Sequence, residues 1–557
     1  MSLASRAAVP LLAAFAVFAG CTTTVVDPGP TSSSSGTESS SSSGTGGSGC
    51  TPGALVACYT GPQATENVGL CHGGAMTCNP DGMTFGACQW EVTPQKEDCA
   101  TPADEDCDGA TPPCQGATVW VDSFGASGNE YGQVVAIDPG GDVIVVGGYD
   151  AASSLGPVGL PSFGQADIFV AKLDPVGNVI WAKGFGSTGA DYATGVAVDA
   201  QGNIAVTGSV AGSVDFGGGT LAGSGLDDIF LLELGPTGNL LWAKVIGSAE
   251  SDQGYGVAFD SAGKLFATGS FQGTIDLGAG PLTSLGSTDL YVARFFQSGQ
   301  AVWSKSYGGA SSDYSSGLVI DASGNLLVTG GFLGPVDFGT GPLTTPGYYD
   351  AFVAKITAMG QTVWAKQLKG GAGMGNYALP AALAVESTGA VVVGGYFYGQ
   401  VDLGGGPLTS AGGTDAFLAR FDASGVFTYG KRFGGSYVYP GQPKYVTDAI
   451  LGVAVDAGDN AVIVGEYIDT IDFGGGPLAK SPYGGGFLAR VAPTGQQISA
   501  KAYGNDVSYV AASGVAVRSS GDAVVTGSFT GTVDFGKGDV SSPSTQDSDL
   551  FVLETLP

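Results

Sequence analysis

The chain has 557 residues, of which 43% are hydrophobic and 13% charged, so it can form several large cores. Its 50 acidic and 20 basic residues give a formal net charge of −30, which repels phosphates and anionic lipid headgroups and excludes nucleic acid as a partner. The 97 glycines and the low charge content predict short strands joined by tight turns.

The first 20 residues form a predicted secretory signal peptide. Arg6 precedes an apolar run that is too short to span a membrane, and small residues follow. "FAGC" (18–21) resembles the lipobox of bacterial lipoproteins, although Phe18 replaces the usual leucine. The resemblance implies that Cys21 is lipidated and anchors an exported protein at the outer membrane or cell surface of a bacterium. A plain signal peptide, with Cys21 incidental, is the alternative.

A tether and a cysteine-rich module follow the signal peptide. Residues 21–49 consist of Cys21 and a Ser/Gly-rich stretch that cannot form a core. Residues 50–116 form a predicted module stapled by disulfides, because its cysteines are even in number and the compartment is oxidising. The sequence does not distinguish among the many pairings of these residues, which are Cys50, Cys58, Cys71, Cys78, Cys88, Cys99, Cys107 and Cys114.

The segment "DEDCDG" (104–109) is similar to the first half of a calcium loop. Alternate carboxylates at Asp104, Asp106 and Asp108 can converge on one hard cation. Gln115 stands where an EF-hand has its bidentate glutamate, so the second half departs from that pattern. The segment also resembles Cys-rich repeats of bacterial surface proteins that are described as metal-binding. An acidic turn between two bridges is the alternative to a calcium site.

One unit recurs across residues 117–557. Each unit contains two hairpins, exemplified by "GVAVDAQGNIAVTGS" (195–209) and "DIFLLELGPTGNLLWAKVIG" (228–247), in which glycine supplies the positive φ of the turn. The first strand occurs seven times, from "VVAID" (134–138) to "GVAVR" (514–518). The fourth strand carries tryptophans spaced 61 residues apart, namely Trp120, Trp181, Trp242, Trp303 and Trp364.

Seven units of four strands predict an all-β fold, a seven-bladed β-propeller. "DLFVLETL" (549–556) is a third strand without a fourth strand after it. "VWVDSFG" (119–125) is a fourth strand with no other strand of a repeat unit before it. The seventh blade is therefore predicted to be closed by the N-terminal strand. The tryptophans are predicted to pack between blades and not to bind a ligand.

The repeat resembles the SBBP family of bacterial β-propeller repeats over roughly residues 117–557. The matching elements are "GVAVDAQGNIAVTGS", "VDFGGG" and "DIFVAKLDPVGNVIWAKGFG". The resemblance implies the propeller architecture, and it implies no single defined activity.

Two long loops in each unit emerge on one face of the predicted ring, which makes that face the better candidate for binding. The loop at 434–452 is the longest between blades, and its exposed aromatics suit a sugar or a peptide. Its candidate ligand-binding residues are Tyr437, Tyr439, Lys444 and Tyr445. The aspartates of the recurring "VDFG" loops are predicted to cap turns, and they are Asp215, Asp276, Asp337, Asp402, Asp472 and Asp534.

The sequence favours a lipid-anchored binding or scaffolding protein of the cell envelope, monomeric, with a polysaccharide or a surface protein as partner. Catalysis has little support, because the one histidine, His72, lies outside the propeller and no nucleophile or phosphate-binding motif occurs. A polysaccharide-active enzyme using loop aspartates is one alternative. A purely structural surface component is the other. Calcium is the one cofactor that the sequence suggests.

Overall fold

The computed structural model of the chain describes residues 50–62, 65–94, 104, 107, 116–126, 128–346, 348–373, 375–438, 448–542 and 547–557. The predicted signal peptide, Cys21 and the Ser/Gly-rich segment therefore lie outside the described residues. The chain divides into two compact units, residues 1–114 and 115–557. Within the described ranges, no helix is both long and apolar enough to cross a membrane.

The N-terminal unit is held together by a small hairpin and by disulfide bonds. Strand β1 (Leu55–Cys58) pairs antiparallel with β2 (Gly74–Thr77). The predicted disulfide framework is confirmed at six cysteines, which pair as Cys50–Cys78, Cys58–Cys88 and Cys71–Cys107. Cys99 and Cys114 lie outside the described residues. The disulfides indicate an extracellular or exported protein.

The predicted calcium loop is described only in part. Asp104 is 6% exposed, and its backbone carbonyl accepts a hydrogen bond from the N–H of Leu70 at 2.9 Å. Asp106 and Asp108 lie outside the described residues, so calcium binding stays a prediction. The ring of His72 lies with Nδ1 3.1 Å from the carbonyl oxygen of Gly73, in an exposed position.

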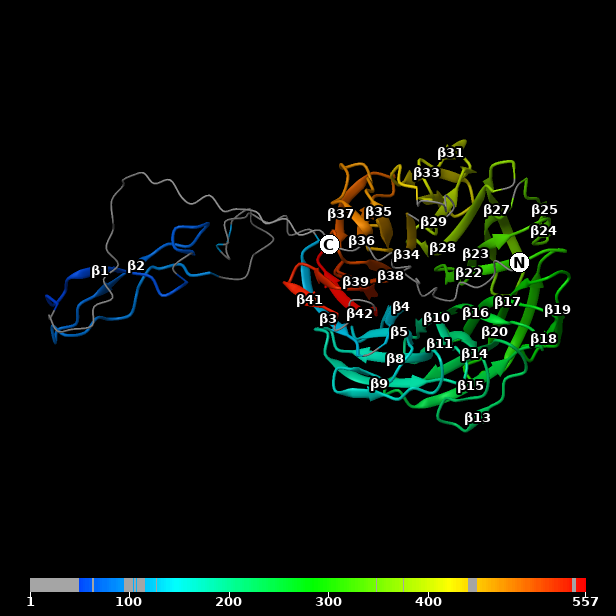
Figure 1. Cartoon of the computed structure of the whole chain (residues 1–557), viewed down its shortest axis with the longest axis horizontal. Coiled ribbons are helices and arrows are strands. Elements are labelled where there is room, and N and C mark those ends of the chain that lie inside the picture. Colours follow the sequence, from blue (N-terminus) through cyan, green and yellow to red (C-terminus); the bar gives the residue numbers. More distant parts are fainter. Residues whose placement is uncertain are drawn as a thin grey trace, which may run out of the picture. The chain divides into compact units, whose positions relative to one another are not determined.

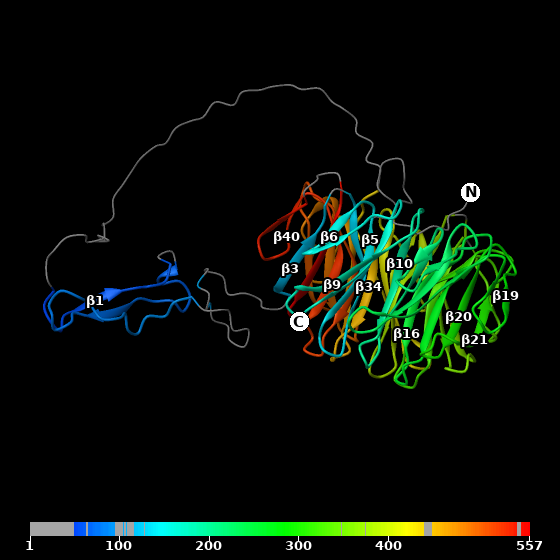
Figure 2. The same cartoon turned by 90° about the horizontal axis from the view of Figure 1, so that it is seen from below.

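The second unit is a seven-bladed β-propeller, as predicted (Figure 1). Seven antiparallel sheets, each with four main strands, are arranged around a ring, and in blade 4 the hairpin β30 (Gln400–Asp402) and β31 (Pro407–Thr409) extends the sheet. Seen from the side, the strands run through the thickness of the ring (Figure 2). The first strands of neighbouring blades pack against one another around the centre.

The strands of each blade follow in the order of their hydrogen bonding. Blade 1 comprises β4 (Glu130–Ile137), β5 (Val143–Tyr149), β8 (Asp167–Leu173) and β9 (Val179–Phe185); blade 2 comprises β10 (Tyr192–Val198), β11 (Ile204–Val210), β14 (Asp228–Leu234) and β15 (Leu240–Ile246); blade 3 comprises β16 (Gln253–Phe259), β17 (Leu265–Phe271), β20 (Asp289–Phe295) and β21 (Ala301–Tyr307); blade 4 comprises β22 (Asp313–Ile320), β23 (Leu326–Phe332), β26 (Asp350–Ile356) and β27 (Thr362–Gly370). Blade 5 comprises β28 (Tyr377–Val385), β29 (Val391–Tyr398), β32 (Asp415–Phe421) and β33 (Phe427–Phe433); blade 6 comprises β34 (Ala449–Val455), β35 (Ala461–Asp469), β36 (Ser481–Val491) and β37 (Gln497–Tyr503); blade 7 comprises β38 (Val510–Val517), β39 (Ala523–Phe529), β42 (Asp549–Thr555) and β3 (Thr118–Phe124).

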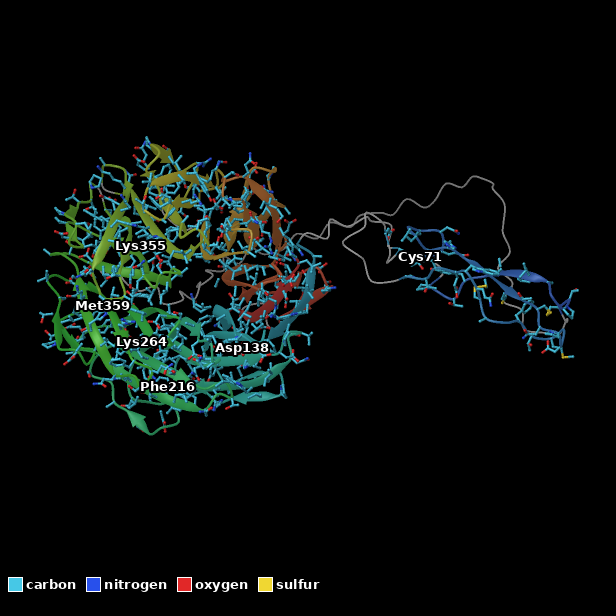
Figure 3. All side chains as sticks on the ribbon, turned by 180° about the vertical axis from the view of Figure 1, so that it is seen from behind. Cys71, Asp138, Phe216, Lys264, Lys355 and Met359 are labelled. Carbon is cyan, nitrogen blue, oxygen red and sulfur yellow. A yellow bond between two sulfur atoms is a disulfide. The ribbon has the colours of Figure 1, made fainter. Side chains whose placement is uncertain are left out.

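The two middle strands of each blade are the most buried, because both of their faces are covered by neighbouring blades. The seven residues of β11 are all buried, whereas the outer strand β15 is only half-buried. Each apolar core lies between two blades and not inside one: Ile144 of blade 1 packs in one cluster with Val206 and Phe230 of blade 2. Phe216, labelled in Figure 3, joins the same cluster, with its ring centroid 5.3 Å from that of Phe230.

The recurring tryptophans join each blade to the next, which confirms their predicted role in packing. The indole N–H of Trp181 on β9 donates to the carbonyl of Pro236, in the turn between β14 and β15 of blade 2. Gly238 in that turn has φ +78°, and a Cβ there would lie 3.2 Å from the indole ring. Equivalent bonds, each to a carbonyl in the next blade, are made by Trp120, Trp242, Trp303 and Trp364.

The seventh blade is closed as the sequence predicts. Strand β3 pairs antiparallel with β42, and Trp120 lies opposite Glu554. Figure 1 shows the cyan-blue β3 beside the red strands of the same blade. Leu556 donates its N–H to the carbonyl of Ala117 at 2.9 Å, which continues the pairing beyond the strands. β3 therefore covers the edge of β42 that would otherwise be unpaired and completes the closing blade.

The recurring "VDFG" segments form small hairpins within the long loops between the second and third strands. The carboxylate of Asp215, in β12 (Val214–Asp215), accepts the N–H of Gly217 at 2.7 Å and that of Gly219 at 3.0 Å. The same two hydrogen bonds recur at all six aspartates of this set, which confirms that they cap turns.

Candidate functional site

The face with the long loops was the expected binding face, and the acidic side chain that recurs there just before or at the start of a blade's first strand is turned inward. Asp191 is fully buried at the start of blade 2, and its Oδ1 accepts the N–H of Ala211 at 2.8 Å. Asp252 accepts the N–H of Gln272 in the same way in blade 3. Burial raises the pKa of the equivalent Asp313 to about 7. These carboxylates hold loops in place, and none of them presents a charged group to solvent.

The predicted ligand-binding loop before blade 6, residues 434–452, is described only at its two ends. Tyr437 is half-buried, and its backbone carbonyl accepts the N–H of Gly413, in blade 5, at 2.8 Å. Val438 beside it is 45% exposed. Tyr439, Lys444 and Tyr445 lie outside the described residues. The role of this loop in ligand binding therefore stays a prediction.

A pocket of about 770 Å³ opens on the opposite face, where the short turns lie, at the junction of blades 2 and 3. Blade 2 contributes side chains from the β10–β11 turn, from β14 and from β15. Blade 3 contributes its two turns, β16–β17 and β20–β21. The lining residues are Gln201, Asn203, Glu233, Leu241, Trp242, Ser261, Ala262, Gln297 and Ser298.

Glu233 is the charged group of this pocket. It lies on β14 directly opposite Trp242 of β15 and is only 1% exposed. The indole N–H of Trp242 donates to Oε2 of Glu233 at 2.8 Å and also to the carbonyl of Gln297 at 3.0 Å. This bifurcated hydrogen bond fixes the carboxylate and ties it to blade 3.

The surroundings of Glu233 make its ionisation unfavourable. Burial, together with the nearby charge of Asp199, raises the pKa of Glu233 to about 7, although the hydrogen bond from Trp242 acts in the opposite direction. Asp199 is 4% exposed and belongs to the β10–β11 turn, where Oδ1 accepts the N–H groups of Gln201 and Asn203, each at 2.8 Å. A positive charge entering the pocket would stabilise the ionised form of Glu233.

The chemistry of the pocket suits recognition of a donor-rich group. It offers one carboxylate, the side-chain amides of Gln201, Asn203 and Gln297, two serine hydroxyls and part of an indole. Among the described residues, no group of three or more His, Cys, Asp or Glu side chains is arranged to hold a metal ion.

No family model matches the chain. It is similar to an uncharacterised WD repeat-containing protein of Acanthamoeba polyphaga mimivirus, at 24% identity over 63% of this chain and 30% of that protein. It is also similar to the regulatory protein FlaEY of Caulobacter vibrioides, at 26% identity over 71% of this chain and 43% of that protein. The chain thus spans less than half the length of either curated relative. The resemblance to SBBP repeats stays a prediction.

Solved structures share the propeller at low similarity. A gluconolactonase from Xanthomonas campestris aligns at 13% identity with a TM-score of 0.31, over 78% of this chain and 97% of that chain. The propeller domain of the trilobed protease of Pyrococcus furiosus aligns at 9% identity with a TM-score of 0.36, over 77% and 95%. Neither value is high enough to transfer an activity. The propeller fold itself is suited to protein interaction.

Glu233 was not among the residues predicted from the sequence, although the sequence contains a signal for it. The third strands "DIFVAKL", "DIFLLEL" and "DLYVARF" end alike, and the residue before the last is Lys172 in blade 1, Glu233 in blade 2 and Arg294 in blade 3. Aligning the seven units at this position shows an acid in blades 2 and 7, and the residue after the first strand, Asp199 in blade 2 against Arg518 in blade 7, distinguishes blade 2.

Proposed function

We propose that the protein is an exported, lipid-anchored binding or scaffolding protein of the cell envelope, whose propeller engages a surface protein or an envelope polysaccharide. The observation that carries the proposal is the pocket at the junction of blades 2 and 3, because it is an asymmetric opening in an otherwise repetitive ring. Three disulfides support export, and the lipobox-like segment before Cys21 supports a lipid anchor.

The binding role is tested with the chain from Cys21 onward, carrying Cys21→Ser to prevent acylation. It is titrated with isolated envelope polysaccharides and with solubilised envelope proteins, with and without calcium. Saturable binding by the folded chain supports the proposal. Turnover of a polysaccharide would instead support the enzyme alternative, and binding of neither class would support a purely structural component.

The anchor is tested separately in a bacterium that exports the chain. We expect the full-length protein to fractionate with membranes and to incorporate labelled fatty acid. The Cys21→Ser chain should be exported without the label. Equal labelling of both chains would refute lipidation at Cys21.

A further inference from the structure

Six of the seven blades contain the same internal ion pair. It joins the residue that follows the first strand to the residue on the third strand that faces the tryptophan position. Figure 3 labels one member of two of these pairs, Asp138 of blade 1 and Lys355 of blade 4. The pairs are Asp138–Lys172 at 2.7 Å, Asp260–Arg294 at 2.7 Å, Asp321–Lys355 at 2.8 Å, Glu386–Arg420 at 2.6 Å, Asp456–Arg490 at 3.5 Å and Arg518–Glu554 at 2.8 Å. All of these side chains are largely buried.

Blade 2 is the exception, because acids occupy both positions. Asp199 follows its first strand and Glu233 lies on its third strand, and the two are 4% and 1% exposed. Among the ion pairs of the described residues, none includes either side chain. Blade 2 therefore lacks the cation that the other six blades have at this place. A buried carboxylate without a counter-charge is unfavourable in its ionised form.

Blade 7 shows how a cation fits beside a glutamate in this position. Glu554 accepts the indole N–H of Trp120 at 2.8 Å, as Glu233 accepts that of Trp242. Arg518 then donates from Nε to Oε1 of Glu554 at 2.8 Å and from Nη2 to Oε2 at 3.1 Å. Its Nη1 donates to the carbonyl of Gly141, in a turn of the next blade.

In blade 2 the residue that corresponds to Arg518 is Asp199, and the pocket opens beside Glu233. The carbonyl that corresponds to Gly141 is that of Gly263, in the β16–β17 turn whose Ser261 and Ala262 line the pocket. The elements that hold a guanidinium in blade 7 are therefore repeated at this junction, except for the guanidinium itself.

We propose that the pocket at the junction of blades 2 and 3 binds a guanidinium or primary ammonium group of a ligand, which pairs with Glu233 as Arg518 pairs with Glu554. The proposal deepens the binding role proposed above and rests on it. The net charge of −30 favours the approach of a cation. The amide oxygens of Gln201, Asn203 and Gln297 add acceptors for the remaining donors.

A bare metal ion fits the pocket less well than an organic cation. Calcium takes about six to eight oxygen ligands, several of them carboxylate oxygens. Asp199 is already engaged, because its Oδ1 accepts two backbone N–H groups and its Oδ2 accepts the side-chain N–H of Asn203 at 2.8 Å. Glu233 is then the one carboxylate left for a ligand, and a planar guanidinium can use both of its oxygens.

The test is calorimetric titration of the full-length chain with Nα-acetyl-L-argininamide (argininamide), with Nα-acetyl-L-citrullinamide (citrullinamide) as the neutral analogue of similar shape, because acetylation removes the α-ammonium charge from both. We expect saturable binding of argininamide and none of citrullinamide. Glu233→Gln should weaken argininamide binding by at least about tenfold, because a charge-assisted pair is lost. Glu233→Lys should abolish binding while the fold is kept, because lysine supplies the cation internally, as Lys172 does in blade 1. Glu250→Gln, which removes an exposed acid of the opposite face, should change nothing.

Other outcomes refute the proposal or identify the source of the cation. Absence of argininamide binding by the folded protein, equal binding by Glu233→Gln, or displacement of argininamide by calcium would each overturn it. A peptide with one central arginine that binds much more tightly than argininamide indicates a protein ligand, whereas equal affinity indicates a free amine. Envelope binding that persists in Glu233→Lys would refute the pocket proposal and leave the proposed binding role intact.

Discussion

Replacing Glu233 by glutamine should stabilise the protein, and the gain should grow with pH. An ordinary glutamate has a pKa of 4.5, and burial raises that of Glu233 to about 7. Between these values the folded state holds a proton that the unfolded state has lost, so the free energy of unfolding falls as pH rises through this window. Glutamine keeps the shape and accepts the hydrogen bond from Trp242 without ever ionising.

The expected gain follows from the same two values. At pH 8 Glu233 is ionised in both states, and the ionised form costs the folded state on the order of 2–3 kcal/mol. At pH 5 the cost is below about 1 kcal/mol, because the folded state is still protonated there. Measurements at pH 4 are avoided, because the sequence pI is about 4.1 and solubility is lowest near it.

The assay is urea unfolding at pH 5 and pH 8, with the variant compared with the wild-type chain at each pH so that other buried carboxylates cancel. Glu554→Gln is the matched control, because it has the same contact with tryptophan but already pairs with Arg518. That control should lose about 3 kcal/mol at pH 8, since it leaves a buried arginine unpaired. A difference between Glu233→Gln and wild type that is the same at both pH values would refute the reasoning.

Three further outcomes are expected. Deletion of residues 117–126 removes β3 and exposes the edge of β42, so we expect the product to aggregate, which size-exclusion chromatography would detect. A monomeric, cooperatively unfolding product would contradict the closure of blade 7 by β3. Trp303→Ala should destabilise the propeller by about 2–3 kcal/mol in thermal unfolding, because the side chain is half-buried, packs on Phe266 and loses its bond to Ala358. An effect below about 0.5 kcal/mol would contradict its role in joining blades. Reduction of the disulfides should make residues 50–94 sensitive to limited proteolysis while the propeller stays resistant, and equal loss of both units would show that they unfold together.

The architecture could be predicted from the sequence because it is repeated. Trp120 and "DLFVLETL" (549–556) are complementary fragments of one blade, and an exact spacing between tryptophans gives the length of each unit. Turn capping by Asp215 was predictable for the same reason, since a carboxylate beside glycine has a local partner. Disulfide pairing was not, because it depends on distances between residues far apart in the module.

The candidate site could not be predicted by the same means. Its side chains come from two blades. Glu233 stands where blade 1 has Lys172, and this is a single replacement in an otherwise regular strand. Whether the charged residue at position 233 is paired depends on Asp199, which lies 34 positions earlier in the chain. The long-loop face was predicted to bind a ligand because its loops are long. The pocket lies on the other face, where the charge pattern beneath the short turns distinguishes blade 2.

The closure of the ring makes its completion depend on the order of synthesis. Trp120 is hydrogen-bonded to Glu554, 434 positions later, so β3 is among the first propeller strands to leave the ribosome and the last to find its partner. Until β42 is made, the growing propeller has an open edge at each end, and both are exposed to pairing with other chains. Export in an unfolded form would postpone this risk, because the whole propeller would then be available when folding begins.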